Sequence, residues 1–312
     1  MSASAVVSLA LLALGVVFFL INRTTRLGVV ARGTFREAVR QPLFVGMILI
    51  GLGLFVLYAF LPFFTLGDDT KIFVDSCMAT ILIAGLLLAV WTASQTVSEE
   101  REGKTVVTLL SKPLTRVEFI LGKFLGILEA VHLQIVALGA LLLPVLYYKI
   151  PYDRREGGGG RMDYFERTDF GGRLADPIDF FNLEIIGQVV EVIPILGMIF
   201  LSSAMMAAVA VTLSTRLPAL VTQIACFALF ILGNLLPTLM QSAIGDQVFL
   251  KFIAQLFSAV VPGFWAYDTF TAVSTGRDIP LTHLGTVALY SVCYIAVMMF
   301  VAFLLFEDED LA

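Results

Sequence analysis

The stretch EEREGKTVVTLLSKPLTRVEFILGK, residues 99–123, places nine charged side chains between two long apolar runs. The chain as a whole is 59% hydrophobic and only 14% charged, so such a concentration of charge is unusual in it. The charges frame a small apolar island of Val106, Val107, Leu109 and Leu110. This pattern indicates a connection that lies in water between two membrane helices.

The same stretch contains Gly103-Lys104-Thr105, which invites comparison with a phosphate-binding loop. Such a loop needs glycine five positions earlier, because its backbone N–H groups must turn toward the phosphates. That position is Ser98, and three carboxylates lie between it and Gly103. Carboxylates repel a polyanion, so we do not expect this chain to hydrolyse ATP itself.

Long apolar runs recur along the whole chain, and the mean hydropathy is +0.93. These features exclude a soluble globular domain and predict an all-α polytopic membrane protein. Windows that cross about 30 Å of hydrocarbon predict seven spans, six core helices and one extra N-terminal helix. The predicted spans are 5–21, 43–65, 74–95, 117–148, 185–213, 219–240 and 284–306.

Two further apolar runs need separate interpretation. Val248–Pro262 is interrupted by Lys251 and is too short to span, which predicts an interfacial or re-entrant helix. The N-terminal run has no basic residues before it, which favours an uncleaved anchor over a signal peptide. The resulting division of the chain is an anchor 1–22, a basic amphipathic segment 23–42, a transmembrane domain 43–306 and an acidic tail 307–312.

Basic residues gather in two connections and predict the topology. The first connection holds Arg23, Arg26, Arg32, Arg36 and Arg40, and the second holds Arg101, Lys104, Lys112, Arg116 and Lys123. Both connections are therefore expected in the cytoplasm. Alternation then places the N-terminus and the segments 149–184 and 241–283 outside and the C-terminus in the cytoplasm, in a multi-pass protein of the inner (cytoplasmic) membrane. The segment 149–184 also carries basic residues, but they are mixed with acidic ones.

Within the first connection, Arg32, Arg36 and Arg40 share one face of a predicted helix at i, i+4 and i+8. The helix is expected to lie along the membrane surface and to end before Pro42. The alternative is an ordinary basic linker.

The second connection, 96–118, is predicted to form a short helix over Thr105–Leu110 that Pro113 ends. Thr115 and Glu118 have the spacing of a capping box that begins the next membrane helix. An apolar patch rimmed by charges suits docking into a groove of another protein better than it suits a solvated loop.

The string Glu100-Arg101-Glu102-Gly103-Lys104-Thr105, followed by Leu109-Leu110-Ser111, Pro113, Arg116 and Gly122-Lys123, closely resembles the signature of ABC-2 type permeases. The upstream residues Thr34–Ala38 resemble the amphipathic elbow helix of that family. The resemblance covers residues 30–306. The chain departs from the family pattern in its extra N-terminal span and in the glycine and lysine that directly follow Glu-Arg-Glu.

The resemblance implies half of a dimeric pore, formed with a second permease subunit, that docks onto a separate ABC ATP-binding subunit. It implies that this chain is not an enzyme and binds no cofactor, since ATP and magnesium belong to the partner. Export is the expected direction, membrane lipids are expected neighbours, and no nucleic acid is expected. The implied contacts with the ATP-binding subunit are Glu99, Glu100, Arg101, Glu102, Gly103, Val106, Val107, Leu109, Leu110 and Arg116.

Ionisable and polar side chains inside predicted spans are candidates for function because they are costly in hydrocarbon. Glu129 and His132 share a helix face, Glu191 lies near the outer end of its span, and Asn234 lies in the sixth span. They are interpreted as residues of a translocation path or of polar contacts within the bundle.

No metal site is predicted from the cysteines and histidines, because their spacing does not match a ligand set. The alternatives to a permease are an integral-membrane enzyme that uses Glu129 and His132, and a non-transporting scaffold with the same bundle.

Overall fold

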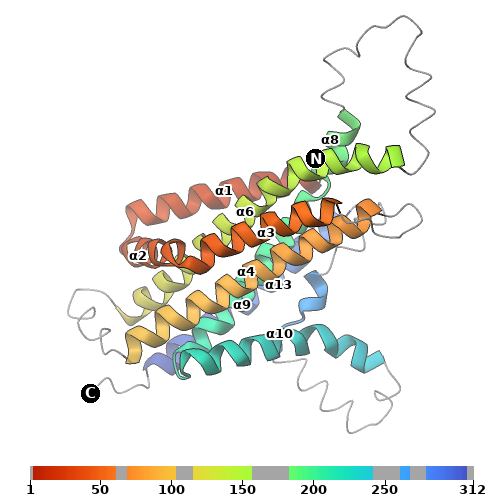
Figure 1. The fold of residues 1–312 in the computed structure, drawn as a ribbon. Helices are drawn as coiled ribbons and strands as arrows, with labels where there is room; N and C mark the ends of the chain where they lie inside the picture. The colour runs from red at the N-terminus through yellow and green to blue at the C-terminus, as the bar shows by residue number, and fades with distance from the viewer. Residues whose placement is uncertain are drawn as a thin grey trace, which may run out of the picture.

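The computed structural model describes residues 3–60, 69–102, 115–156, 183–241, 261–267 and 279–307. Within these ranges the chain forms helices joined by turns and contains no strand (Figure 1). The all-α prediction is confirmed. The elements are α1 (Ala3–Thr24), α2 (Arg26–Arg40), α3 (Pro42–Phe60), α4 (Asp69–Glu102), α6 (Arg116–Glu156), α8 (Leu183–Val190), α9 (Ile193–Ser214), α10 (Ala219–Gln241), the 3-10 helix η3 (Phe264–Tyr267) and α13 (Leu281–Glu307).

In the described part of the chain, six helices are long and apolar enough to cross a bilayer: α1, α3, α4, α6, α9 and α13. The helix α10 has 23 residues, and its described apolar part runs over Ala219–Leu235. These seven helices correspond to the seven predicted spans. The chain is therefore a polytopic helical membrane protein.

Two helices extend beyond the spans predicted from hydropathy. The helix α4 covers Asp69–Glu102 where 74–95 was predicted, and α6 covers Arg116–Glu156 where 117–148 was predicted. A hydropathy window stops where charged residues begin, whereas a helix continues through good helix formers such as glutamate and arginine. Both helices therefore extend beyond the apolar part of their sequence.

The predicted span 185–213 is wrong as a single helix, because the chain turns at Glu191 and Val192 between α8 and α9. Pro194 lies in the first turn of α9 and has no N–H to bond the carbonyl of Val190. The Glu191 N–H still bonds the Gly187 carbonyl at 3.1 Å, and the Ile195 N–H bonds the Val192 carbonyl at 3.2 Å. Proline therefore ends the continuous ladder and starts a new helix.

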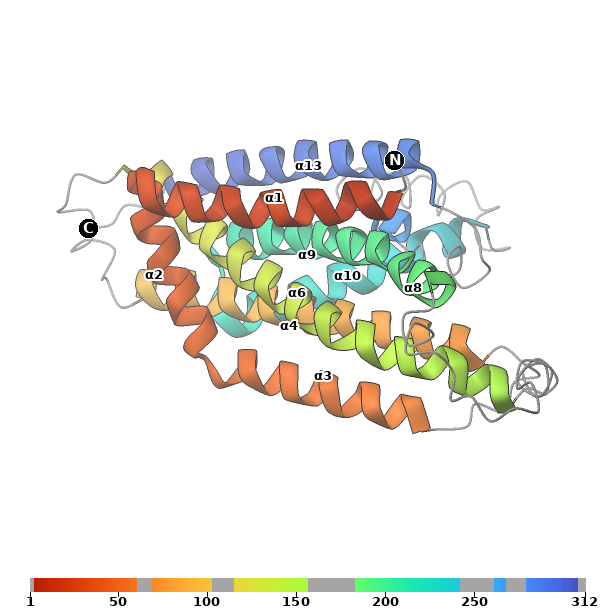
Figure 2. The same cartoon turned by 90° about the horizontal axis from the view of Figure 1, so that it is seen from above.

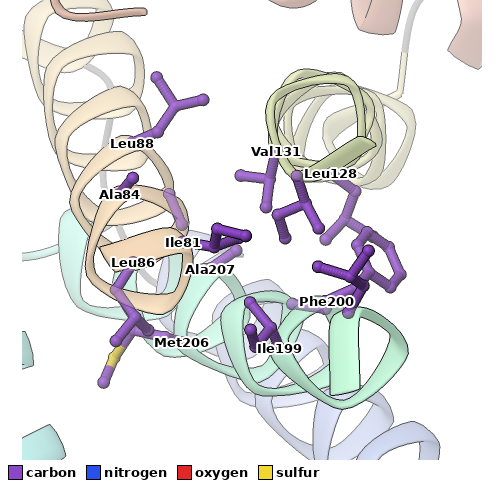
Figure 3. Close-up of a cluster of buried hydrophobic side chains, with 14 of the residues drawn as sticks. Ile81, Ala84, Leu86, Leu88, Leu128, Val131, Ile199, Phe200, Met206 and Ala207 are labelled. Atoms are coloured by element: carbon purple, nitrogen blue, oxygen red, sulfur yellow. The ribbon is translucent and has the colours of Figure 1, made fainter. Parts of the chain in front are cut away.

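The core of the bundle is centred on α9, whose membrane window is 89% buried. Figure 3 shows side chains of α4, α6 and α9 meeting in this core, among them Ile81, Val131 and Phe200. Ser202, Ser203 and Ala204 of α9 are all buried, as their small size predicts for close helix packing. The outer helices differ, because only 11% of the α1 window and 17% of the α3 window are buried. Their exposed apolar faces suit contact with lipid.

One end of the bundle gathers most of the connections that carry basic residues. Ser98 of α4 donates to the Leu217 carbonyl in the turn between α9 and α10, at 3.2 Å. Arg116 at the start of α6 donates to the Phe306 carbonyl of α13, at 3.5 Å. Figure 2 shows α2 crossing this same end, from the end of α1 to the start of α3. We call it the basic end, and it carries Arg23, Arg26, Arg32, Arg36, Arg40, Arg116, Lys123 and Arg216.

The start of α1 lies at the opposite end from the finish of α13 (Figure 2). One end of the bundle holds the first connection, the flanks of the second connection and the turn with Arg216. This arrangement agrees with the predicted alternation of spans. The assignment of that end to the cytoplasm stays a prediction. Residues 248–260 of the run Val248–Pro262, which was predicted to be interfacial or re-entrant, lie outside the described residues.

Candidate functional site at the basic end

The helix α2 is amphipathic, and its narrow face of small residues is buried. Thr25 caps its start, since the Thr25 hydroxyl accepts from the Gly28 N–H at 3.0 Å. Gln41 separates it from Pro42, as predicted. The three arginines predicted to share one helical face are exposed. The buried face consists of Gly28, Ala31, Thr34 and Ala38, and the exposed arginines are Arg32, Arg36 and Arg40.

The buried face of α2 packs against two glycines of α6, one helical turn apart. A Cβ atom added at Gly122 would lie 2.6 Å from Cβ of Val30. A Cβ added at Gly126 would lie 2.5 Å from the Ala31 carbonyl oxygen. No side chain fits at either position without displacing α2, because such contacts are shorter than van der Waals separation. Glycines at i and i+4 thus let two helix backbones approach closely.

An ion pair adds to the contact between α2 and α6. Lys123 of α6 is only 4% exposed, and its Nζ atom lies 3.9 Å from Oε2 of Glu37 on α2. The Lys123 ammonium also lies 5.8 Å from the centre of the Phe119 ring, within the range of a cation–π contact. Because the ammonium is buried between these groups, it holds α2 and α6 in one register.

The start of α6 is fixed by the predicted capping box. The Thr115 N–H donates to Oε2 of Glu118 at 2.8 Å, and the Glu118 N–H donates to the Thr115 hydroxyl at 3.2 Å. These reciprocal bonds satisfy two N–H groups that a helix start otherwise leaves open. The position where α6 begins is therefore defined by the sequence.

The predicted contacts with an ATP-binding subunit fall in the last turn of α4, between α4 and α6, and at the start of α6. Glu99, Glu100, Arg101 and Glu102 form the last turn of α4, and the positions of their side chains lie outside the described part of the structure. The residues Gly103, Val106, Val107, Leu109 and Leu110 also lie outside the described residues. Arg116 is described and exposed. We call the second connection, 96–118, the coupling segment, and the ends of α4 and α6 place its two ends at the basic end.

The first helix is joined to α6 by a polar contact that the sequence did not predict. The Asn22 side-chain amide donates to Oε2 of Glu129 at 2.7 Å. The Arg32 guanidinium donates to the backbone carbonyl of Asn22. Asn22 thus connects the end of α1 to both α2 and α6. In this structure Glu129 makes a polar contact within the bundle.

His132 lies one turn further along α6 and has different neighbours. Its ring packs edge-on against Phe18 at 5.9 Å and Phe200 at 5.5 Å. Its buried Nδ1 atom has no hydrogen-bond partner among the described residues. Glu129 and His132 therefore share a helix face, as predicted, but each packs with its own partners. The described ranges contain no group of three or more metal-binding side chains.

A cavity of about 370 Å³ lies between α4, α9, α10 and η3, away from the basic end. Its walls are largely apolar, and its polar groups come from Ser202, Asn234 and Tyr267. The Tyr267 hydroxyl lies 2.6 Å from Oγ of Ser291 and is buried. The predicted residue Asn234 therefore lines a cavity. Glu191 does not line it and is exposed at the turn between α8 and α9.

Sequence reasoning missed the residues that hold the basic end together. Gly122 and Gly126 have a small-xxx-small spacing that is a known signal for helix contact. Asn22 is a polar residue at the end of an apolar run, which was a detectable signal too. Tyr267 offered no signal, because only folding brings it to Ser291.

The fold and the site define a multi-pass helical membrane protein with an amphipathic helix locked across one end. The family model described as "ABC-2 family transporter protein" matches residues 3–311. The chain therefore belongs to the ABC-2 family of transporter proteins, and it is a membrane component of a transporter. A search among curated proteins found no match. The family match includes α1, so the extra N-terminal helix is part of the matched region rather than an addition to it.

Proposed function

We propose that this chain is the permease subunit of an ABC exporter, driven by ATP hydrolysis in a separate ATP-binding subunit. The observation that carries the proposal is the meeting of α2, α6 and α13 at the end where the coupling segment 96–118 leaves α4 and enters α6. The partner subunit docks onto that segment through Val106, Val107, Leu109 and Leu110 and the charges of Glu99–Glu102. The basic end then faces the cytoplasm.

The coupling works by a shift of population between two arrangements of the bundle. Closure of ATP-binding subunits favours one arrangement, and the coupling segment transmits that preference because it is continuous with α4 and α6. The glycine contact and the Lys123–Glu37 pair carry the displacement to α2. The Arg116–Phe306 and Ser98–Leu217 contacts carry it to α13 and to the α9–α10 turn.

In this proposal, the cavity lined by Asn234 forms part of the substrate path. It lies between α4, α9 and α10, so relative movement of these helices changes its size and opening. A second permease subunit completes the pore, and lipid covers the remaining apolar faces. The Glu129 carboxylate accepts a hydrogen bond from Asn22, whereas His132 packs against aromatic rings. Because the two side chains have separate partners, a structural role is favoured over a shared enzyme site.

Copurification tests this proposal. The tagged chain is isolated from its native membrane in mild detergent, copurifying proteins are identified by mass spectrometry, and ATPase activity of the eluate is measured. We expect an ATP-binding subunit to copurify with the natural chain. It should also copurify with the control variant Val107→Ile and Leu110→Met, which keeps the apolar island. We expect it to be lost with Val107→Asp and Leu110→Asp. Copurification that survives the charged pair contradicts docking through this island.

A further inference from the structure

A second cavity, of about 360 Å³, lies at the basic end between the start of α6 and the end of α13. Figure 2 shows these two helix ends side by side. The cavity is lined by Arg116, Val117, Ile120, Phe303 and Phe306. We call it the α6–α13 groove. The function proposed above uses the Arg116–Phe306 contact but assigns no ligand to the groove.

The walls of the α6–α13 groove are apolar and well fixed. Ile120 and Phe306 are both 2% exposed, so close packing restricts the movement of both side chains. The Phe306 ring also stacks on Phe119, with ring centres 6.1 Å apart. Val117 is 45% exposed and forms the open side. A rigid apolar trough with one open side suits an extended hydrocarbon chain.

Arg116 is the charged residue of the groove lining. Its guanidinium donates to the Phe306 carbonyl at 3.5 Å, which holds it over the end of α13. A guanidinium has five N–H donors, so one carbonyl and one phosphate can be bound together. A cation above an apolar trough matches an anionic headgroup above an acyl chain.

The depth of the α6–α13 groove supports the same ligand. Its walls belong to the terminal turns of two membrane helices, where headgroups meet hydrocarbon. The other arginines of the basic end add positive charge at this level, which attracts anionic lipid. We propose that the groove binds one anionic phospholipid, with its phosphate on Arg116 and an acyl chain between Ile120 and Phe303.

A bound lipid would join α6 to α13 at the end where the coupling segment leads into α6. The proposal shares Arg116 with the proposed coupling contacts, but lipid binding in the groove does not require ATP coupling. Loss of the ATP-binding partner and loss of lipid binding can therefore be observed separately.

The test uses the full chain, purified in detergent, and native mass spectrometry. Dioleoyl phosphatidylglycerol and dioleoyl phosphatidylcholine are added in turn at equal concentration. We expect one phosphatidylglycerol to be retained after washing and phosphatidylcholine to be lost. Arg116→Gln should weaken retention about tenfold, because it removes a charged hydrogen bond to phosphate. Arg23→Gln, at the end of α1 and outside the groove, is the matched control and should retain the lipid.

A second variant protects the test against misfolding of the first. Val117→Trp fills the groove from its exposed side and leaves the guanidinium in place, so it should also weaken retention. Phosphatidylglycerol with a photoreactive acyl chain should cross-link to peptides of α6 and α13. Equal retention of both lipids, equal loss in Arg23→Gln and Arg116→Gln, or cross-links confined to other helices would overturn the proposal. So would displacement of the lipid by inorganic phosphate at equal concentration.

Discussion

The side-chain amide of Asn22 donates to the Glu129 carboxylate at 2.7 Å and so joins the end of α1 to the middle of α6. The two residues are far apart in the sequence, and α1 is otherwise largely exposed. The contact stabilises a helix that few buried side chains hold. It also gives Glu129 a partner in a region where an unpaired carboxylate is costly.

Asn22→Leu should therefore loosen α1. The substitution removes the donor and leaves Glu129 without it, so we expect the free energy of unfolding to fall by about 1 kcal/mol. The measurement is the thermal unfolding midpoint in detergent. Ser8→Ala is the control, because the Ser8 hydroxyl donates to the carbonyl of Ser4 within its own helix. An equal fall in both variants would show that the contact with Glu129 adds nothing.

Gly126→Ala should separate α2 from α6. The new Cβ would lie 2.5 Å from the Ala31 carbonyl oxygen and 2.7 Å from Cβ of Thr34, so α2 has to move. Overpacking of this kind typically costs about 1–3 kcal/mol of stability.

Gly33→Ala is the matched control for the glycine contact. It lies on α2, and a Cβ added there meets nothing within 4 Å. We expect its unfolding midpoint to be unchanged or raised, since alanine favours helix by about 1 kcal/mol over glycine. If Gly126→Ala and Gly33→Ala have the same unfolding midpoint, α2 and α6 do not pack as closely as the structure describes.

Thr115→Ala should fray the start of α6. The substitution removes the hydroxyl that accepts from the Glu118 N–H, and loss of such a cap costs about 1 kcal/mol. We expect faster hydrogen exchange of the first-turn amides of α6, measured by mass spectrometry. Thr24→Ala should leave exchange at α6 unchanged, because its hydroxyl bonds Leu20 within α1. Unchanged exchange in Thr115→Ala would mean that the capping box does not hold this helix start.

Tyr267→Phe should destabilise the wall of the Asn234 cavity. It removes the hydroxyl that lies 2.6 Å from Oγ of Ser291 and 3.1 Å from the sulfur of Met205. We expect a loss of about 1 kcal/mol, measured by thermal unfolding. A cycle with Ser291→Ala isolates the pair, and the double variant should lose less than the two single variants added together. Strict additivity would refute a direct bond between these residues.

The sequence predicted the number and order of the membrane helices well, because each is a long apolar run in a chain with few charges. It predicted the start of α6 from the Thr115 and Glu118 pattern, since a capping box is a local signal. It did not predict the break at Glu191, because α8 and α9 together form one apolar run and hydropathy does not report hydrogen bonds. Pro194 was the available signal.

The candidate site was predictable only where its signals are local. Helical periodicity places the three arginines of α2 on one face, and in the structure this face is exposed. The partners of α2 depend on which helices meet in space, so Gly122 and Gly126 could be weighed only after folding. The same holds for Asn22, whose partner Glu129 lies on α6. The contacts with an ATP-binding subunit remain predictions.

The central claim is that the basic end transmits the state of an ATP-binding partner to the membrane helices. The most direct measurement is hydrogen exchange of the purified complex with and without a non-hydrolysable ATP analogue. We predict nucleotide-dependent changes in α2 and in the first turn of α6, and none of comparable size in α8, which lies at the other end. A partner that binds nucleotide while exchange in α2 and α6 stays the same would contradict the claim.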